Sequence, residues 1–110
     1  QGATGVKARQ ELPTAFALEQ NYPNPFSLSG APHATQIRFS LPQPALVTLT
    51  IHNALGQKIV SLLEGSARAG SHVIHWNGHD AASQPVRSGL YWLRLTTREF
   101  TATRKIVVVR

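Results

Sequence analysis

ALVTLTIHN, at residues 45–53, has the clearest alternation in this sequence. Apolar and polar side chains take turns along it, so that one face carries Val47, Leu49 and Ile51 and the other carries Thr48, Thr50 and His52. Successive side chains of a β-strand point to opposite faces, and a period of two therefore predicts a strand with one buried and one wet face. The stretch indicates a β-sheet protein.

Further short stretches of the same kind lie on both sides of this strand. We expect strands over residues 15–20, 37–41, 57–63, 72–76, 91–95 and 100–109. Turn-forming residues separate them at intervals of about 8 to 12 residues, which is typical of a sandwich or barrel, and no segment has the pattern of a helix. The sequence therefore predicts an all-β, immunoglobulin-like or fibronectin-type antiparallel β-sandwich of about seven strands.

The pattern also predicts where the domain begins and how two strands pair. Residues 1–14 have no period and are predicted to be a linker or the tail of a preceding domain, with the sandwich over residues 15–110. The chain begins at Gln1 and contains no Met, so we expect it to be part of a longer polypeptide. The strands at 37–41 and 45–53 are expected to form a hairpin-like pair.

The composition argues against most catalytic and binding classes. The chain has 110 residues, a formal net charge of +6 and no Cys. Its acidic residues are Glu11, Glu19, Glu64, Asp80 and Glu99, and no two are placed as acid and base partners on one predicted strand. There is no nucleophile elbow, phosphate-binding loop or long apolar run, and basic and aromatic residues do not interleave on one strand face. We expect a protein that is not an enzyme, does not bind nucleic acid and has no membrane span.

No metal site or cofactor is expected from the histidines. His72 and His75 would point to opposite faces of an extended strand, so a shared ion would need a bulge or the turn to bring them together. Asn77 and Asp80, together with loop carbonyls, form the one set that could bind calcium. The alternative is that Asp80 closes a turn by accepting hydrogen bonds from backbone N–H groups.

The two tryptophans have different expected surroundings. Trp76 is predicted to fill the core between the sheets, whereas Trp92 lies on the face opposite Tyr91 and has no obvious partner. An exposed Trp92 would favour a carbohydrate-binding or adhesion module of an extracellular enzyme. An inert immunoglobulin-like spacer in such an enzyme is a further alternative.

The last predicted strand combines basic and β-branched residues. From Arg87 onward there are six basic residues and one acidic residue, Glu99. Ile106 to Val109 place bulky side chains on both faces of the strand. An interior strand that is buried on both faces would explain this pattern. The alternative is a strand that another protein binds, by strand addition for example.

Taken together, four motifs resemble one known family. They are LEQNYPNPF at residues 18–26, WNGHD at 76–80, SGLYWLRL at 88–95 and RKIVVVR at 104–110. The chain resembles, over residues 16–110, the C-terminal sorting domains carried by cargo of the type IX, or Por, secretion system. Members of that family are seven-stranded sandwiches related to the Ig-like module of flagellar hook-capping proteins.

The resemblance implies that the domain is a sorting signal and not a catalyst. It implies a non-catalytic C-terminal secretion signal, covalently part of a larger cargo protein, that passes through the periplasm and directs the cargo through the outer-membrane translocon to the cell surface or the extracellular space. It implies two partners, the translocon and a sortase-like surface peptidase that removes the domain. The recognition positions carried over are Gly89, Tyr91, Arg104, Lys105, Ile106, Val107, Val108, Val109 and Arg110.

Two details of the motifs have a physical interpretation of their own. In LEQNYPNPF each Pro fixes φ, and Asn21 and Asn24 are expected to close the turn on its own backbone. Ser83 stands where the family commonly has Gly. Because a side chain carries a steric penalty at positive φ, this residue argues against a left-handed turn at that point.

Overall fold

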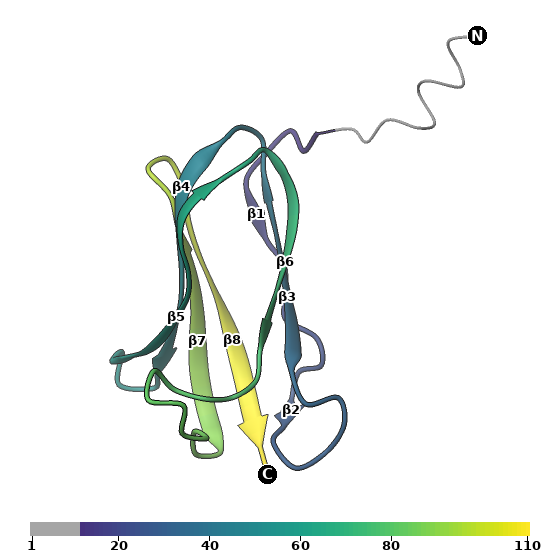
Figure 1. The fold of residues 1–110 in the computed structure, drawn as a ribbon, viewed down its shortest axis with the longest axis vertical. Coiled ribbons are helices and arrows are strands. Elements are labelled where there is room, and N and C mark those ends of the chain that lie inside the picture. Colours follow the sequence, from purple (N-terminus) through teal and green to yellow (C-terminus); the bar gives the residue numbers. More distant parts are fainter. Residues whose placement is uncertain (1–11) are drawn as a thin grey trace, which may run out of the picture.

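A computed structural model describes residues 12–110 as an all-β domain (Figure 1). It has eight strands: β1 (Ala17–Leu18), β2 (Phe26–Ser27), β3 (Thr35–Leu41), β4 (Ala45–Asn53), β5 (Lys58–Ala67), β6 (Gly70–Trp76), β7 (Gly89–Thr96) and β8 (Thr101–Val109). Most of the expected linker at 1–14 lies outside these residues. Nothing in the described part of the chain is a helix long and apolar enough to cross a membrane.

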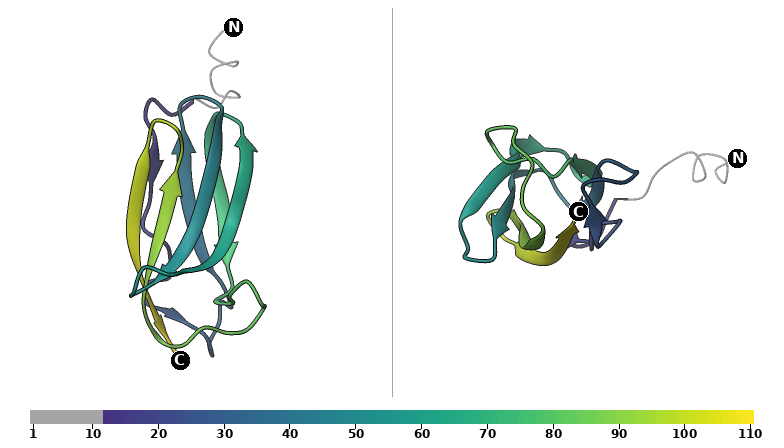
Figure 2. Two further views of the ribbon diagram at one scale, coloured as in Figure 1. Left: turned by 90° about the vertical axis from the view of Figure 1, so that its left-hand side faces the viewer. Right: turned by 90° about the horizontal axis from the view of Figure 1, so that it is seen from below.

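The strands form two sheets that face each other, which confirms the predicted sandwich (Figures 1 and 2). The smaller sheet has the order β1-β3-β6, and the larger has the order β2-β8-β7-β4-β5. Every pair is antiparallel except β2 and β8, which run parallel. β2 is a strand that the sequence did not predict. Its two residues pair with Val108 and Val109, so that a segment from the N-terminal part of the domain lies beside the last strand.

The predicted hairpin of β3 and β4 is wrong. β3 pairs with β1 and β6, whereas β4 pairs with β5 and β7 in the other sheet. Pro42 and Pro44 lie between the two strands and have no N–H to donate to a ladder. The connection therefore carries the chain from one sheet to the other.

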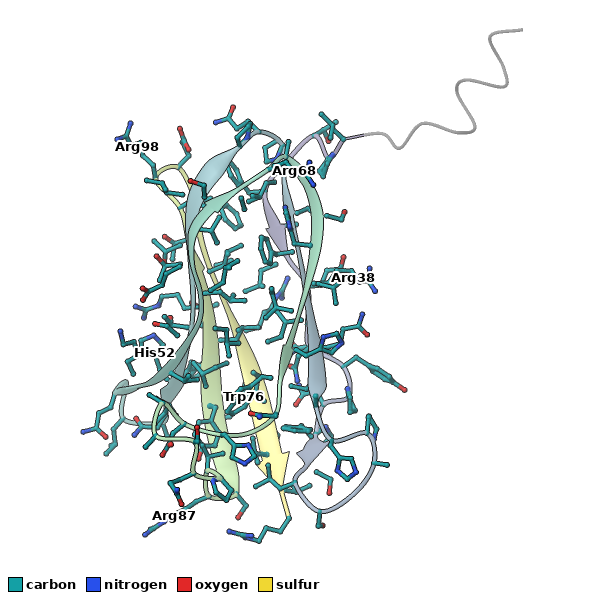
Figure 3. The ribbon with its side chains drawn as sticks, in the orientation of Figure 1. Arg38, His52, Arg68, Trp76, Arg87 and Arg98 are labelled. Atoms are coloured by element: carbon teal, nitrogen blue, oxygen red, sulfur yellow. The ribbon has the colours of Figure 1, made fainter. Side chains whose placement is uncertain are left out.

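The core fills the space between the sheets, and Trp76 is part of it, as predicted. Figure 3 shows Trp76 in the lower half of the sandwich. Trp76 is 1% exposed, its ring centroid is 6.0 Å from that of Phe26 and 5.9 Å from that of Tyr91, and its Nε1 donates to the carbonyl of His79. The alternating residues of β3, β4 and β7 supply much of the rest: Ile37, Phe39, Leu41, Val47, Leu49, Ile51, Leu93 and Leu95. Each such side chain contributes about 1.5–3 kcal/mol when fully buried, so these strands hold the sandwich together.

β5 is longer and less regular than predicted. It ends at Ala67 rather than near Leu63, and its pairing with β4 is interrupted by two irregularities. The register passes from Leu63 to Ser61 and from Val60 to Lys58, which leaves Leu62 and Ile59 without partners on β4. Such bulges break the period of two, so the local sequence does not reveal how far the strand extends.

Candidate recognition site: the last strand and the segment that covers it

β8 is hydrogen-bonded to a strand on each side. It pairs with β7 from Thr101, which lies opposite Thr96, to Val108, which lies opposite Gly89. On its other side Phe26 and Ser27 of β2 pair with Val108 and Val109. The last strand is therefore an interior strand at its C-terminal end, as the first explanation for its apolar side chains requires, although that explanation also requires both faces to be buried.

The two faces of β8 differ in exposure. Ile106 and Val108 point into the core and are 0% and 1% exposed. Val107 is half-buried on the outer face, and Val109, on the same face, is 39% exposed. The expectation that both faces are buried is thus wrong for Val109, which is only partly covered on the outer face of the larger sheet.

Two side-chain amides cover the free edge of β8 where β2 does not reach. Asn24 donates from Nδ2 to the Lys105 carbonyl (3.2 Å), and its Oδ1 accepts from the Val107 N–H (2.9 Å). Gln20 donates from Nε2 to the same Lys105 carbonyl (2.7 Å). We call Gln20 and Asn24 the amide clasp. The Asn24 amide gives β8 the donor and the acceptor that a peptide group of a neighbouring strand would supply.

The clasp corrects the role expected for Asn24. Asn21 does close the turn, since its Nδ2 donates to the Pro23 carbonyl (3.2 Å) and to Thr35 Oγ1 (2.8 Å). Asn24 instead bonds to β8, more than 80 positions away in the sequence. Sequence reasoning missed this role because an Asn beside a Pro has the same local signature in both cases.

Arg104 and Lys105 leave β8 in opposite directions. Arg104 lies on the inward-facing side at the open edge, and its Nε donates to the carbonyl of Leu18 in β1 (2.8 Å). Lys105 pairs with Trp92 on the outer face of the larger sheet and is exposed. Only Lys105 of this pair therefore presents its charge on the outer face.

Gly89 and Tyr91 both have structural roles. Gly89 begins β7 with a φ of 150°, a conformation that other residues rarely adopt. Tyr91 is 7% exposed, and its hydroxyl donates to the Arg87 carbonyl (2.7 Å). Burial raises the pKa of the Tyr91 phenol above its ordinary value, and this effect outweighs the opposing ones of the hydrogen bond and the Arg87 charge. The Tyr91 side chain is not presented at the surface.

Trp92 is half-buried on the outer face of the larger sheet, between His52 of β4 and Lys105 of β8. Beside it is a shallow hollow of about 420 Å³, lined also by Leu55, Arg94 and Thr103. The His52 ring is held by two hydrogen bonds: its Nδ1 donates to the Gly56 carbonyl (3.3 Å), and its Nε2 is bonded to the Thr50 hydroxyl (2.9 Å). The structure thus gives Trp92 a partly open indole face with fixed neighbours.

The loop between β6 and β7 is closed by Asp80, as the turn interpretation predicted. Asp80 Oδ1 accepts from the N–H groups of Ala82 (2.9 Å) and Gln84 (3.0 Å), and Asn77 Oδ1 accepts from His79 N–H (3.0 Å). Ser83 has a φ of 64°, so the left-handed turn that its identity argued against is present. Two backbone hydrogen bonds hold this turn: Ser83 N–H donates to the Asp80 carbonyl and Asp80 N–H to the Gln84 carbonyl.

The histidines lie as the strand geometry predicted. His72 stacks on Phe39 at a centroid distance of 5.0 Å, while His75 is exposed on the other face of β6. Among residues 12–110 there is no group of three or more His, Cys, Asp or Glu side chains that could hold a metal ion.

Comparison with known proteins places this fold. The structure is similar to that of PorZ, an essential bacterial surface component of the type IX secretion system of Porphyromonas gingivalis, with a TM-score of 0.58 and 18% sequence identity. The similar region covers 87% of this chain but only 12% of PorZ, and at this identity the likeness concerns the fold alone. No curated protein matches the chain. Residues 24–99 match the model of the FlgD Ig-like domain, and the chain belongs to that family.

Proposed function

We propose that this domain is a non-catalytic C-terminal secretion signal. It directs a larger exported cargo protein, of which it is covalently a part, through the type IX outer-membrane translocon to the cell surface. In this proposal the domain crosses the periplasm folded, engages the translocon and is then removed by a sortase-like surface peptidase. The similarity of its fold to part of a type IX surface component supports the same system.

One observation carries the proposal: the motifs at the two ends of the domain bind each other. Asn24, in LEQNYPNPF, hydrogen-bonds to Lys105 and Val107, in RKIVVVR. The contact holds the last strand in place and leaves Lys105, Val109 and Arg110 exposed. A spacer needs a stable sandwich but has no need of a basic, partly apolar strand displayed in a fixed position.

The test is a transport assay with the whole chain. We would fuse residues 1–110 to the C-terminus of a neutral reporter and measure the fraction of reporter that external protease removes from intact cells. The expected result is surface display in a host with a working type IX system and periplasmic retention in the same host without its translocon. Equal retention in both hosts would contradict the proposal and favour an inert spacer.

Removing residues 104–110 is not a clean version of this test. The deletion would take Ile106 and Val108 out of the core and would break the pairing of β8 with β2. A truncated domain would therefore fail to fold, whatever its role in transport. Substitutions on the exposed face of β8 avoid this difficulty.

A further inference from the structure

Four apolar side chains form one strip on the outer face of β7 and β8. Leu90 pairs with Val107 and Trp92 pairs with Lys105 across the two strands, and Val109 continues the face beyond Val107. We call Leu90, Trp92, Val107 and Val109 the outer strip. Leu90 and Trp92 are absent from the recognition positions that the family resemblance supplies, yet the register places them next to the exposed half of the terminal motif.

The outer strip continues into the hollow beside Trp92. Leu55, in the turn between β4 and β5, is 84% exposed and lines this hollow together with His52. An indole face, an exposed leucine and a fixed imidazole form a depression suited to one large apolar side chain from another protein. The hollow is too open to enclose a small ligand, which favours a surface contact.

The charges around the outer strip have one sign. Arg94 lines the hollow, Lys105 lies next to Trp92, and both are exposed. The outward-facing residues of β7 and β8 include no carboxylate. Glu64, on the same face of the sheet but on β5, accepts a hydrogen bond from Ser61 Oγ (2.8 Å). Charge complementarity therefore selects a partner surface with acidic groups.

The backbone under the outer strip is fixed. β7 is paired on both sides, and β8 is paired to β7 and covered by β2 and the amide clasp on its other side. A surface that is already ordered loses little conformational entropy on binding, which makes a small patch of Trp, Leu and Lys effective.

We propose that the outer strip, with Arg94 and Lys105, is the surface by which a protein partner recognises this domain. The partner inserts an apolar side chain into the hollow beside Trp92 and places carboxylates against Arg94 and Lys105. The inference rests on the proposed secretion function and makes it specific: the partner binds the outer face of the last two strands, and the buried Tyr91, Ile106 and Val108 support that face from below.

The experiment uses the reporter fusion of the whole chain with two sets of matched variants. The first set is Arg94→Glu with Lys105→Glu, and separately Val109→Thr. The controls make the same chemical changes elsewhere. Arg68→Glu with Arg98→Glu alters two turns at the far end of the sandwich (Figure 3). Val73→Thr alters the smaller sheet, where Val73 is also 39% exposed. Thermal melting of each purified chain checks that it folds.

We expect the outer-strip charge reversal to lower the displayed fraction at least about tenfold and Val109→Thr about two- to fivefold, with both control variants displayed like the wild type. If the wild-type fusion is displayed and both outer-strip variants are displayed equally well, the inference is overturned and the secretion function stands. Equal losses in the two charge-reversal variants would also overturn it, because the effect would then be one of net charge. Failure of the wild-type fusion to reach the surface would overturn the secretion function itself.

A carbohydrate partner would give a different result. In that case the purified wild-type chain would be retained on an alginate column, Arg94→Glu with Lys105→Glu would abolish the retention, and the same variant would still be displayed normally. That outcome would overturn the protein-partner inference and assign the outer strip to an acidic polysaccharide.

Discussion

The two edges of the five-stranded sheet are protected in different ways. At one edge, β5 carries two irregularities in its pairing with β4, and the Ala81 N–H of the β6–β7 loop donates to the Ile59 carbonyl (3.1 Å). At the other edge, β8 is covered by the two residues of β2 and by the side chains of the amide clasp. Both devices stop a free strand edge from pairing with another chain.

The two edges differ in how far their protection depends on the identity of particular residues. A backbone N–H such as that of Ala81 is available from any residue except Pro, so the β5 edge sets few demands on residue identity. The β8 edge uses an amide side chain at position 24, because the Asn24 amide supplies both a donor and an acceptor to the strand. This explains in physical terms why the specific motif LEQNYPNPF lies beside β8 and not beside β5.

The largest test of this contrast removes the anchor of β2. Phe26 is 1% exposed and packs against Trp76, so Phe26→Ala should lower the free energy of unfolding by about 3–5 kcal/mol. Leu62→Ala, at the half-buried bulge of β5, should lower it by only about 1 kcal/mol. Urea denaturation of the two variants measures the difference. Similar losses at the two edges would contradict the view that the β8 edge depends on specific side chains.

The next test removes the clasp and leaves the core intact. Asn24→Ala should cost about 1–2 kcal/mol, because the Val107 N–H loses its partner and the Lys105 carbonyl loses one of two. Gln20→Ala is the control and should cost less, since Asn24 still occupies both groups. Hydrogen exchange of the Val107 amide should quicken in the first variant and stay unchanged in the second. An unchanged Val107 exchange rate in Asn24→Ala would show that the clasp has no protective role.

A third test concerns the loop that covers β5. Tyr91 fixes the end of this loop through the Arg87 carbonyl, so Tyr91→Phe should cost about 1 kcal/mol at pH 7. The folded state raises the pKa of Tyr91, so it holds the phenol proton more tightly than the unfolded chain does. Wild-type stability should therefore fall as the pH rises past the ordinary tyrosine pKa of about 10. The difference in free energy of unfolding between the wild type and Tyr91→Phe should narrow in this alkaline range. A constant gap across that range would contradict the burial effect.

The smallest expected effect is a gain in stability. Ser83 adopts a left-handed φ of 64° in the same loop, and Ser83→Gly should stabilise the domain by about 0.5–1 kcal/mol because Gly has no Cβ to crowd. Ser83→Ala keeps the Cβ and should give no gain. Melting temperatures of the two variants measure this, and a loss of stability in Ser83→Gly would mean that the hydroxyl compensates for the strain.

The parts of the fold that the sequence predicted are those with a local signal. Ile37 to Leu41 and Val47 to Ile51 alternate in the sequence and in the structure, and Trp76 is buried where its neighbours placed it. Asp80 closes its turn with groups two and four residues away. Each of these features depends on contacts within a few positions or on a period of two.

The parts that the sequence did not predict depend on distant contacts. β2 has two residues and no period, and it exists because Val108 and Val109 lie beside it. β5 continues through Gly65 and Ser66, which are turn-forming residue types, because Val47 and Leu46 of β4 pair with them. The alternation of Trp92 with Tyr91 did indicate an outward-facing indole, but only the register with β8 joins it to Lys105 and Val107.

The parallel pairing of β2 with β8 also has a consequence for the order of folding. Asn24 and Val107 are separated by 83 positions, and β8 lies between β2 and β7 in the finished sheet. A chain delivered from its N-terminus can thus close this sheet only after residue 109 has emerged, because the strand that joins β2 to the rest is the last to arrive. Contacts of such long range form slowly. Completion of the larger sheet therefore requires that residues 26–109 have all been delivered.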